Sequence, residues 1–473
     1  MTILPELALV LAALSFFGLS LTPHPDTTRM RNAAVFFGAL VFIGTVITLG
    51  RSAVLFDGSL QVDRFSQFFK LMISSGLFFV LVGTRKLYGI ARRVRPEYYM
   101  FLFLSCLGLM LLVSATELIT LFVALELSSF SLYLMVPMRD EQTGRREQME
   151  AGIKYILFGV LATGFMLYGM SYIFGLTGTT YLGDIALGLR QTASRPAAFF
   201  AVVLVLAGFF YKLALFPMHF WVPDVYEGAA NETTTFVATV PKLGAVALLI
   251  RFVVLVPGDA HVLVTLMMVL ALCSMFYGNL IALVQTDVKR MLGYSGIAHA
   301  GFILFGLLTM KSGGYAMAMY YISGYVFMNI ACYTVLCHVS EQGENLSIGD
   351  LAGLHKREPF LAFLLALGLF ALAGIPPMVG FTGEFMLLAG VLKEGPQFLI
   401  PVILAAINAG IAIYYYLSVI KSAYTADDGD RGVVSINPLT RISGTALMVI
   451  IVLMGIFPSR IIAYADAAVK AIM

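Results

Sequence analysis

The chain has 473 residues, of which 60% are hydrophobic and 12% charged, with a formal net charge of +3 and a mean hydropathy of +0.90. This composition excludes a water-soluble globular protein, and the small net charge gives no basis for nucleic-acid binding. Apolar runs of about 20 residues recur along the chain, and each can cross the roughly 30 Å hydrocarbon core of a bilayer. The sequence therefore predicts an all-α polytopic membrane protein.

About fourteen apolar segments follow one another. Their predicted starts lie near residues 3, 33, 66, 98, 117, 150, 196, 231, 261, 290, 314, 359, 397 and 440. The longest polar loops are predicted at 50–65, 138–149, 177–195, 341–358 and 425–440. Because the connections are short, we expect one membrane domain over 1–473. We divide it into N-terminal helices (1–97), a first repeat (98–255), a second repeat (261–424) and a last helix (440–458).

Basic residues are unevenly distributed between the loops. Most Lys and Arg residues follow odd-numbered segments, including Arg85, Lys86, Arg92, Arg93 and Arg95. By the positive-inside rule these loops face the cytoplasm, so an even number of segments places both termini on the periplasmic side. The N-terminal stretch MTILPELALV has no basic region before its apolar run, so we expect a first membrane helix and not a cleaved signal.

Four ionisable residues lie deep within predicted segments. They are Glu126 in the fifth, Lys212 in the seventh, Lys242 in the eighth and Glu384 in the twelfth. A charge at the bilayer centre costs about 2.5–3.5 kcal/mol on insertion scales, so such groups usually have a function. The alternative for each is a structural ion pair between helices. Four such residues favour a proton path, because packing alone rarely needs so many.

Two of these segments carry helix-breaking residues. Pro217 follows Lys212 by five positions, and the run Gly374 to Pro377 precedes Glu384. A proline inside a helix frees carbonyl groups, which in lipid are tolerated only beside protein or cavity water. Broken helices in corresponding positions indicate an inverted-repeat transporter with its ion path at mid-membrane. Segments 4–8 and 9–13 would form the two five-helix repeats, with helices 7 and 12 broken.

Other polar or aromatic residues have more open interpretations. His299, deep in the tenth segment, is either a proton relay or a hydrogen-bonded packing residue. Lys154 is expected to reach the membrane surface, and the lone Trp221 to mark a membrane interface. The four cysteines fit no zinc or iron–sulfur spacing, and no glycine motif for a nucleotide follows a strand. We therefore expect no metal, nucleotide or flavin site on this chain.

Four stretches carry a family resemblance, at 150–182, 210–229, 278–302 and 374–385. Through them the chain resembles the antiporter-like membrane subunits of respiratory complex I, and most of all the subunit N branch of the bacterial NADH:quinone oxidoreductases. The resemblance runs from about Leu4 to Pro458. It implies a subunit that couples electron transfer from NADH to quinone with proton pumping across the bacterial inner membrane.

The resemblance also implies roles for particular residues. Glu126 and Lys212 match a glutamate–lysine pair, Lys242 matches a central lysine, and His299 matches a histidine on the polar axis. Glu384 is a departure, because subunit N typically has a lysine there and the M-type paralogue a glutamate. The proton path is thus expected to comprise Glu126, Lys212, Lys242, His299 and Glu384.

The resemblance places the cofactors and partners elsewhere. NADH, FMN, iron–sulfur clusters and quinone are expected on other subunits, with the M-type subunit and small membrane subunits as neighbours in the lipid bilayer. Three alternatives remain open at this stage: a multi-subunit cation/proton antiporter, the membrane arm of a related hydrogenase or ferredoxin-linked complex, and a structural scaffold.

Overall fold

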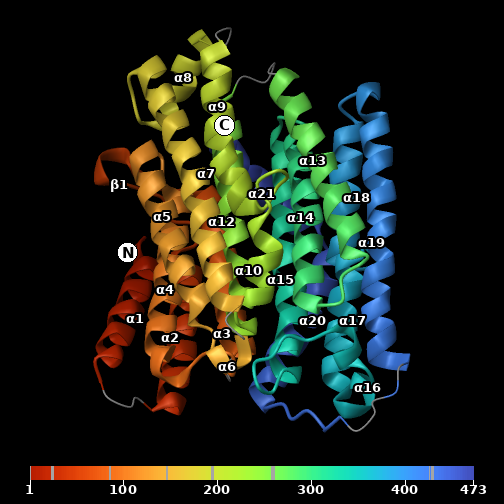
Figure 1. Ribbon diagram of the computed structural model, residues 1–473. Helices are drawn as coiled ribbons and strands as arrows, with labels where there is room; N and C mark the ends of the chain where they lie inside the picture. Colours follow the sequence, from red (N-terminus) through yellow and green to blue (C-terminus); the bar gives the residue numbers. More distant parts are fainter. Residues whose placement is uncertain are drawn as a thin grey trace.

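The computed structural model describes residues 2–22, 26–84, 87–144, 147–192, 196–256, 261–425, 427 and 431–473. Arg85 and Lys86, which entered the charge argument, lie outside these ranges. The described residues form a bundle of long, roughly aligned helices (Figure 1).

The N-terminal helices and the first repeat come first in the bundle. Helices α1 to α5 span Leu4–Ser20, Thr27–Thr48, Arg64–Gly83, Arg95–Ser114 and Leu118–Met135. Helices α6 to α12 span Glu141–Gly144, Glu147–Thr177, Leu182–Thr192, Pro196–Leu213, Trp221–Gly228, Asn231–Val237 and Val240–Val253.

The second repeat and the C-terminal helices follow. Helices α13 to α18 span His261–Ala282, Val288–Leu307, Ser312–Val339, Leu354–Arg357, Pro359–Leu372 and Val379–Leu392. Helices α19 to α21 span Leu399–Thr425, Pro438–Ile456 and Ser459–Lys470. Short 3-10 turns cover Phe56–Gly58, Arg92–Val94, Val136–Met138, Ile348–Leu351 and Pro396–Phe398.

The helix count agrees with the predicted segments. In the described ranges, 11 helices are long and apolar enough to cross a membrane, and α1, α17 and α18 are shorter apolar helices. Because α17 and α18 are two halves of the twelfth segment, and α14 is the tenth, all fourteen predicted segments are accounted for. The prediction of a polytopic all-α membrane protein is confirmed.

Three predicted details need correction. The polar loop at 50–65 contains an antiparallel hairpin of β1 (Ala53–Leu55) and β2 (Leu60–Val62), and the loop at 177–195 contains the amphipathic helix α8. The eighth segment is also interrupted, between α11 and α12. Pro241 then lies in the first turn of α12, where proline is tolerated because its missing N–H would have no partner.

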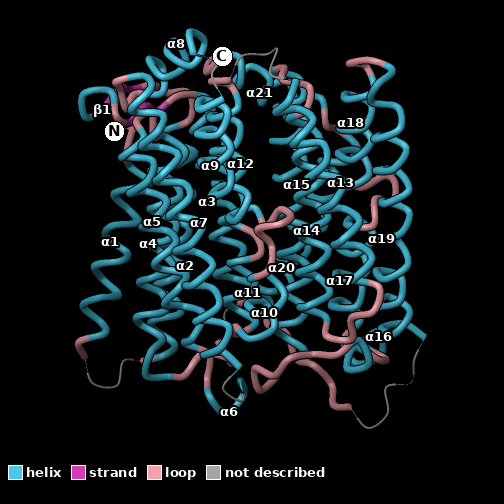
Figure 2. The backbone as a smooth tube through the Cα atoms, turned by 45° about the horizontal axis from the view of Figure 1, so that its top comes forward, coloured by secondary structure: helices cyan, strands magenta, loops and turns pink. Residues whose placement is uncertain are grey.

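The two predicted breaks are present, and the broken helices run in opposite directions. Figure 1 shows α9 above α10 but α17 below α18. This antiparallel relation is what an inverted repeat requires, although the residue limits that we assigned to the repeats stay a prediction. Figure 2 shows both termini toward the end of the bundle that carries α8.

Helix α15 is the central element of the bundle. The membrane-spanning stretch of this helix is wholly buried inside the protein. It packs against helices of both repeats and of the two flanking regions, namely α3, α11, α12, α14, α17, α18, α20 and α21. Polar side chains on α15 therefore lie at the centre of the molecule, where they can meet groups from either repeat.

Candidate functional site: a buried polar series

Glu126 and Lys212 interact electrostatically, and among the described residues no direct ion pair joins them. The Glu126 carboxylate on α5 accepts a hydrogen bond from Thr163 Oγ1 of α7 at 2.9 Å. Lys212, in the last turn of α9, lies against aromatic rings, with Nζ 5.5 Å from the Tyr133 centroid and 5.7 Å from that of Tyr211. The two charges still interact electrostatically. The Glu126 carboxylate is hydrogen-bonded to Thr163, and its interaction with the Lys212 ammonium group is through space.

The break after Lys212 is stabilised mainly by side chains of the bundle. Helix α9 ends at Leu213 and α10 begins at Trp221, whose indole N–H donates to the carbonyl of Tyr211 at 3.0 Å. The backbone N–H of Phe216 donates to Ser274 Oγ of α13 at 2.9 Å. Trp221 is only 2% exposed, so our assignment of this residue to a membrane interface was wrong. Its N–H donates to a carbonyl near the break, so a protein group satisfies this carbonyl.

Lys242 is buried in the first turn of α12, among neutral partners. Its Nζ donates to the Tyr325 hydroxyl at 3.0 Å and to the Gly296 carbonyl at 3.3 Å. A Cβ on Gly296 would lie 2.8 Å from Nζ and 2.8 Å from that hydroxyl. Any larger residue at this position would therefore force both groups to shift. Among the described residues no carboxylate pairs with Lys242.

His299 and Glu384 are joined through a tyrosine. Tyr321 of α15 lies 2.6 Å from His299 Nδ1 and donates to Glu384 Oε1 at 2.9 Å. His299 Nε2 lies 3.0 Å from the hydroxyl of Tyr416 on α19. All three residues of the His299–Tyr321–Glu384 series are buried. Both ring nitrogens of His299 hydrogen-bond to tyrosine hydroxyls, an arrangement that a proton relay and a hydrogen-bonded packing residue share, so its role stays a prediction.

The Lys242–Tyr325 pair and the His299–Tyr321–Glu384 series meet where the ring of His299 on α14 lies beside the ring of Tyr325 on α15. The rings of His299 and Tyr325 have centroids 5.4 Å apart. Lys242, Tyr325, His299, Tyr321 and Glu384 therefore form one nearly continuous polar series. Lys212 and Glu126 are not part of it, since no hydrogen bond among the described residues joins them to Lys242.

The site residues that the sequence analysis did not predict are two tyrosines, which contribute hydroxyl groups. Tyr321 and Tyr325 carry the series, yet a tyrosine in an apolar segment is easily taken for packing. One signal was available: they are one helical turn apart, and a buried tyrosine hydroxyl usually needs a partner.

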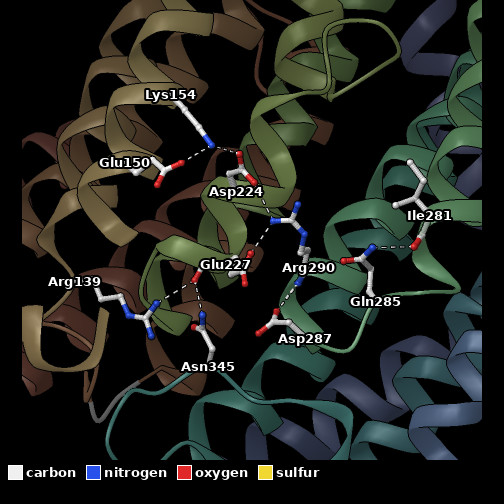
Figure 3. A network of polar contacts seen from close by, with 10 residues as sticks. All are labelled: Arg139, Glu150, Lys154, Asp224, Glu227, Ile281, Gln285, Asp287, Arg290 and Asn345. Atoms are coloured by element: carbon white, nitrogen blue, oxygen red, sulfur yellow. Dashed lines mark hydrogen bonds and ion pairs between the residues drawn. The ribbon is translucent and has the colours of Figure 1, made fainter. Parts of the chain in front are cut away.

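A partly exposed charge network lies between the two repeats, beside α10 (Figure 3). Arg290 of α14 pairs with Asp224 at 2.9 Å and with Glu227 at 2.7 Å. Lys154 of α7 pairs with Asp224 at 2.6 Å and with Glu150 at 2.7 Å. Arg290 thereby joins α14 of the second repeat to α10 of the first, and it is a residue that the sequence analysis did not single out.

The basic side chains also cap the end of α10. Arg139 donates to the carbonyls of Glu227 and Gly228, Asn345 donates to that of Glu227, and Lys289 donates to that of Ala229 at 2.7 Å. Cations at a helix C-terminus satisfy carbonyls that have no partner within the helix and complement its dipole. The half-helix after the first break is thereby fixed to loops and to the second repeat.

The described residues contain no group of three His, Cys, Asp or Glu side chains that could hold a metal ion. The chemistry that the site offers is proton exchange between amine, phenol, imidazole and carboxyl groups.

Comparisons with known proteins agree with this geometry. Residues 115–410 match the family described as NADH:quinone oxidoreductase/Mrp antiporter, TM. A relative from Opitutus terrae, named NADH-quinone oxidoreductase subunit N 2, is 48% identical over 96% of this chain and 95% of its own length. The chain belongs to the NADH-quinone oxidoreductase subunit N family. The expected resemblance is confirmed.

Chains of a solved respiratory complex I and of a more distant complex share the fold. A chain of respiratory complex I from Thermus thermophilus is similar with a TM-score of 0.83 and 29% identity, over 98% of this chain and all of that one. A chain of the Mrp complex from a Dietzia species has a TM-score of 0.85 at 18% identity, over 100% and 96% of the two chains. The second likeness shows a common fold alone. The subunit N relative favours complex I over the cation/proton antiporter.

Proposed function

We propose that this chain is the proton-translocating, antiporter-like subunit N of a bacterial NADH:quinone oxidoreductase. One observation carries the proposal. Lys242, Tyr325, His299, Tyr321 and Glu384 form a buried series of exchangeable groups, and its members hydrogen-bond to neutral groups or to each other. Such a series can change its protonation without breaking a helix-locking ion pair.

The first step of the mechanism concerns Lys212 and Glu126. Glu126 favours the charged form of Lys212 through space. If a change in a neighbouring subunit moves or neutralises Glu126, desolvation acts unopposed and favours the neutral amine. The released proton then passes toward Lys242. Because no hydrogen bond joins the two lysines in the described chain, water must mediate this transfer.

The later steps follow the α15 tyrosines. Protonated His299 can give its Nδ1 proton to Tyr321 while the Tyr321 hydroxyl gives its own proton to Glu384. No net charge remains on the phenol, so the tyrosine acts as a relay and not as a store. Glu384 then holds the proton until release. A carboxyl group serves here as well as the family's lysine would, because both load and unload one proton.

The setting of the subunit completes the proposal. It lies in the bacterial inner membrane with both termini periplasmic, beside the M-type antiporter-like subunit and small membrane subunits. NADH, FMN, iron–sulfur clusters and quinone are bound by other subunits. This chain performs no redox step itself and contributes only proton transfer.

Proton pumping by the assembled complex in sealed vesicles tests the proposal. Lys212→Ala and Lys242→Ala should each lower the number of protons pumped per electron, with electron transfer recorded in the same samples. Lys421→Ala, an exposed lysine on α19, is the control. If both buried-lysine variants assemble and pump at the unaltered ratio, the proton-path function is wrong. Glu384→Lys should pump normally if the position accepts either charge.

A further inference from the structure

A second polar stripe continues along α15 beyond the series described above. Tyr325, Asn329, Tyr333 and Cys337 follow one another at intervals of four residues, so they form a slowly winding line on the helix. All four are buried, none more than 6% exposed. Twelve residues of helix separate the first from the last, a length of about 18 Å. The stripe leads from Lys242 toward the end of the bundle where α14 begins.

Three polar atoms along this stripe have no hydrogen-bond partner in the described part of the chain. They are Asn329 Oδ1, the Tyr333 hydroxyl and the hydroxyl of Tyr226, which faces them from α10. Tyr226 interacts electrostatically with both Tyr325 and Tyr333, so the three tyrosine hydroxyls lie in one region. A buried polar group without a hydrogen bond is costly, and three together call for small partners that can both donate and accept. Water is that partner in protein interiors.

The far end of the stripe reaches two buried titratable groups. Cys337 interacts electrostatically with Glu232 and Lys289, and its Sγ lies 3.6 Å from Thr235 Oγ1. Glu232 Oε1 accepts from the backbone N–H of Gly89 at 3.1 Å, but Oε2 has no protein partner. Lys289 is 1% exposed.

This buried group adjoins the partly exposed network of Figure 3. Lys289 precedes Arg290 in α14, and Arg290 is 29% exposed between Asp224 and Glu227. Tyr226 lies between those two acidic residues in the sequence of α10. One face of α10 therefore borders the charged network and the other borders the unpaired hydroxyls.

We propose that Tyr226, Asn329 and Tyr333 hold a short file of internal water molecules. This file is a second limb of the proton route, linking Tyr325 and Lys242 to Glu232 and Lys289. A proton given up by Glu232 or Lys289 enters the file, each water accepts one proton and passes one on, and Lys242 takes up the last. The limb rests on the proposed function, because it has a purpose only if Lys242 is loaded and discharged.

The experiment combines a hydration measurement with a pumping measurement on the intact complex. Radiolytic hydroxyl-radical labelling modifies side chains next to bound water even when they are buried. Tyr226 and Tyr333 should be labelled. Tyr320 should not, because it is buried on the same helix with its hydroxyl bonded to the Met454 carbonyl at 2.7 Å.

Pumping is then measured in Tyr333→Phe and in Tyr333→Phe/Asn329→Leu, with Tyr320→Phe as the matched control and Lys242→Ala as the reference for the main route. The single variant should slow pumping about fivefold, the rate equivalent of one lost hydrogen bond, and the double variant further. Each loses few atoms, so assembly should persist. Tyr320→Phe should pump normally.

The outcomes separate the limb from the main route. If Lys242→Ala impairs pumping while the double variant pumps normally, the limb is wrong and the proposed function stands. If Lys242→Ala pumps normally, the limb is wrong because it ends at Lys242, and if Lys212→Ala also pumps normally the proposed function fails with it. Absence of label on Tyr226 and Tyr333 also overturns the water file, whatever the pumping rates.

Discussion

Buried charges in this bundle are held in two chemically different ways. Lys70 and Glu6 form a direct ion pair at 2.6 Å, and Arg251 and Asp63 another at 3.0 Å. Lys242, in contrast, contacts a phenol and a carbonyl. A direct carboxylate partner holds an amine in its charged form, whereas neutral partners leave it free to lose the proton. Structural ion pairs, which were the alternative for the predicted residues, exist at these other positions, and His299 Nδ1 also lies 4.0 Å from Glu384 Oε1.

At the residue scale, the direct pair makes the first prediction. Lys70→Met should leave Glu6 as an unpaired buried carboxyl and destabilise the subunit by about 3–5 kcal/mol. The double variant Glu6→Gln/Lys70→Met should recover most of that loss. The measurement is the melting temperature and assembled yield of the purified complex. Equal losses in the single and double variants would show that Glu6 and Lys70 are not energetically coupled.

Tyr321 makes the second residue-scale prediction, because its hydroxyl bridges His299 and Glu384. Tyr321→Phe keeps the ring but removes the bridge, so pumping should fall about fivefold, as for one lost hydrogen bond in a transfer step. The complex should still assemble. Tyr315→Phe, another buried tyrosine of α15, is the control and should pump normally. Normal pumping by Tyr321→Phe would remove the tyrosine from the route.

At the element scale, the breaks place chemistry where a continuous helix could not. Gly374 has a φ of +67°, and a Cβ there would lie 2.7 Å from Glu384 Oε2. The chain thus turns sharply and lets the carboxylate lie against the backbone of the break. At the other break, the indole N–H of Trp221 donates to the Tyr211 carbonyl, and the backbone N–H of Phe216 donates to Ser274 Oγ. Both breaks are fixed structures and not loosened helices.

Gly374→Ala tests the role of the second break. The left-handed conformation costs a non-glycine residue about 1–3 kcal/mol, and the new methyl group must displace the Glu384 carboxylate. Proton pumping should therefore fall while electron transfer persists. Gly410→Ala in α19 is the matched control, because a Cβ there meets nothing within 4 Å. A Gly374→Ala complex that pumps like the unaltered one would mean that Glu384 needs no contact with the break.

The sequence predicted the elements better than their contacts, for a physical reason. Long apolar runs and prolines act locally, so the fourteen segments and the breaks near Pro217 and Pro376 could be predicted. The interruption before Val240 also has a local signal, Pro241, which the sequence analysis did not interpret as a break. The bond from Lys242 to Tyr325 crosses 83 residues and depends on how α12 packs against α15. The bond from Thr163 to Glu126 could not be predicted for the same reason, since Thr163 comes from another helix, α7.

At the scale of the whole molecule, the polar groups form a belt across two inverted halves. Glu126 and Lys212 belong to the first repeat, Lys242 stands at its end, and His299 and Glu384 belong to the second. The central α15 touches helices of both halves and supplies the tyrosines between them. Opposed broken helices place one half-helix toward each membrane surface (Figure 1). Such an arrangement suits uptake from one side and release to the other.

The direction of that transport depends on how the bundle lies in the membrane, which gives the last prediction. Figures 1 and 2 place α8 at one end and the C-terminal end of α1 at the other. Basic residues favour the cytoplasm for the second end. Gln191→Cys on α8 and Thr22→Cys after α1 are exposed sites for a membrane-impermeant maleimide.

In right-side-out vesicles Gln191→Cys should be labelled and Thr22→Cys protected, and inverted vesicles should reverse the result. The unaltered chain is the control, because Cys106, Cys332 and Cys337 are buried and Cys273 is partly buried. The opposite pattern would place both termini in the cytoplasm. The Lys289–Glu232 limb would then face the periplasm and serve proton release. This labelling experiment therefore determines the direction in which protons move along the whole polar series.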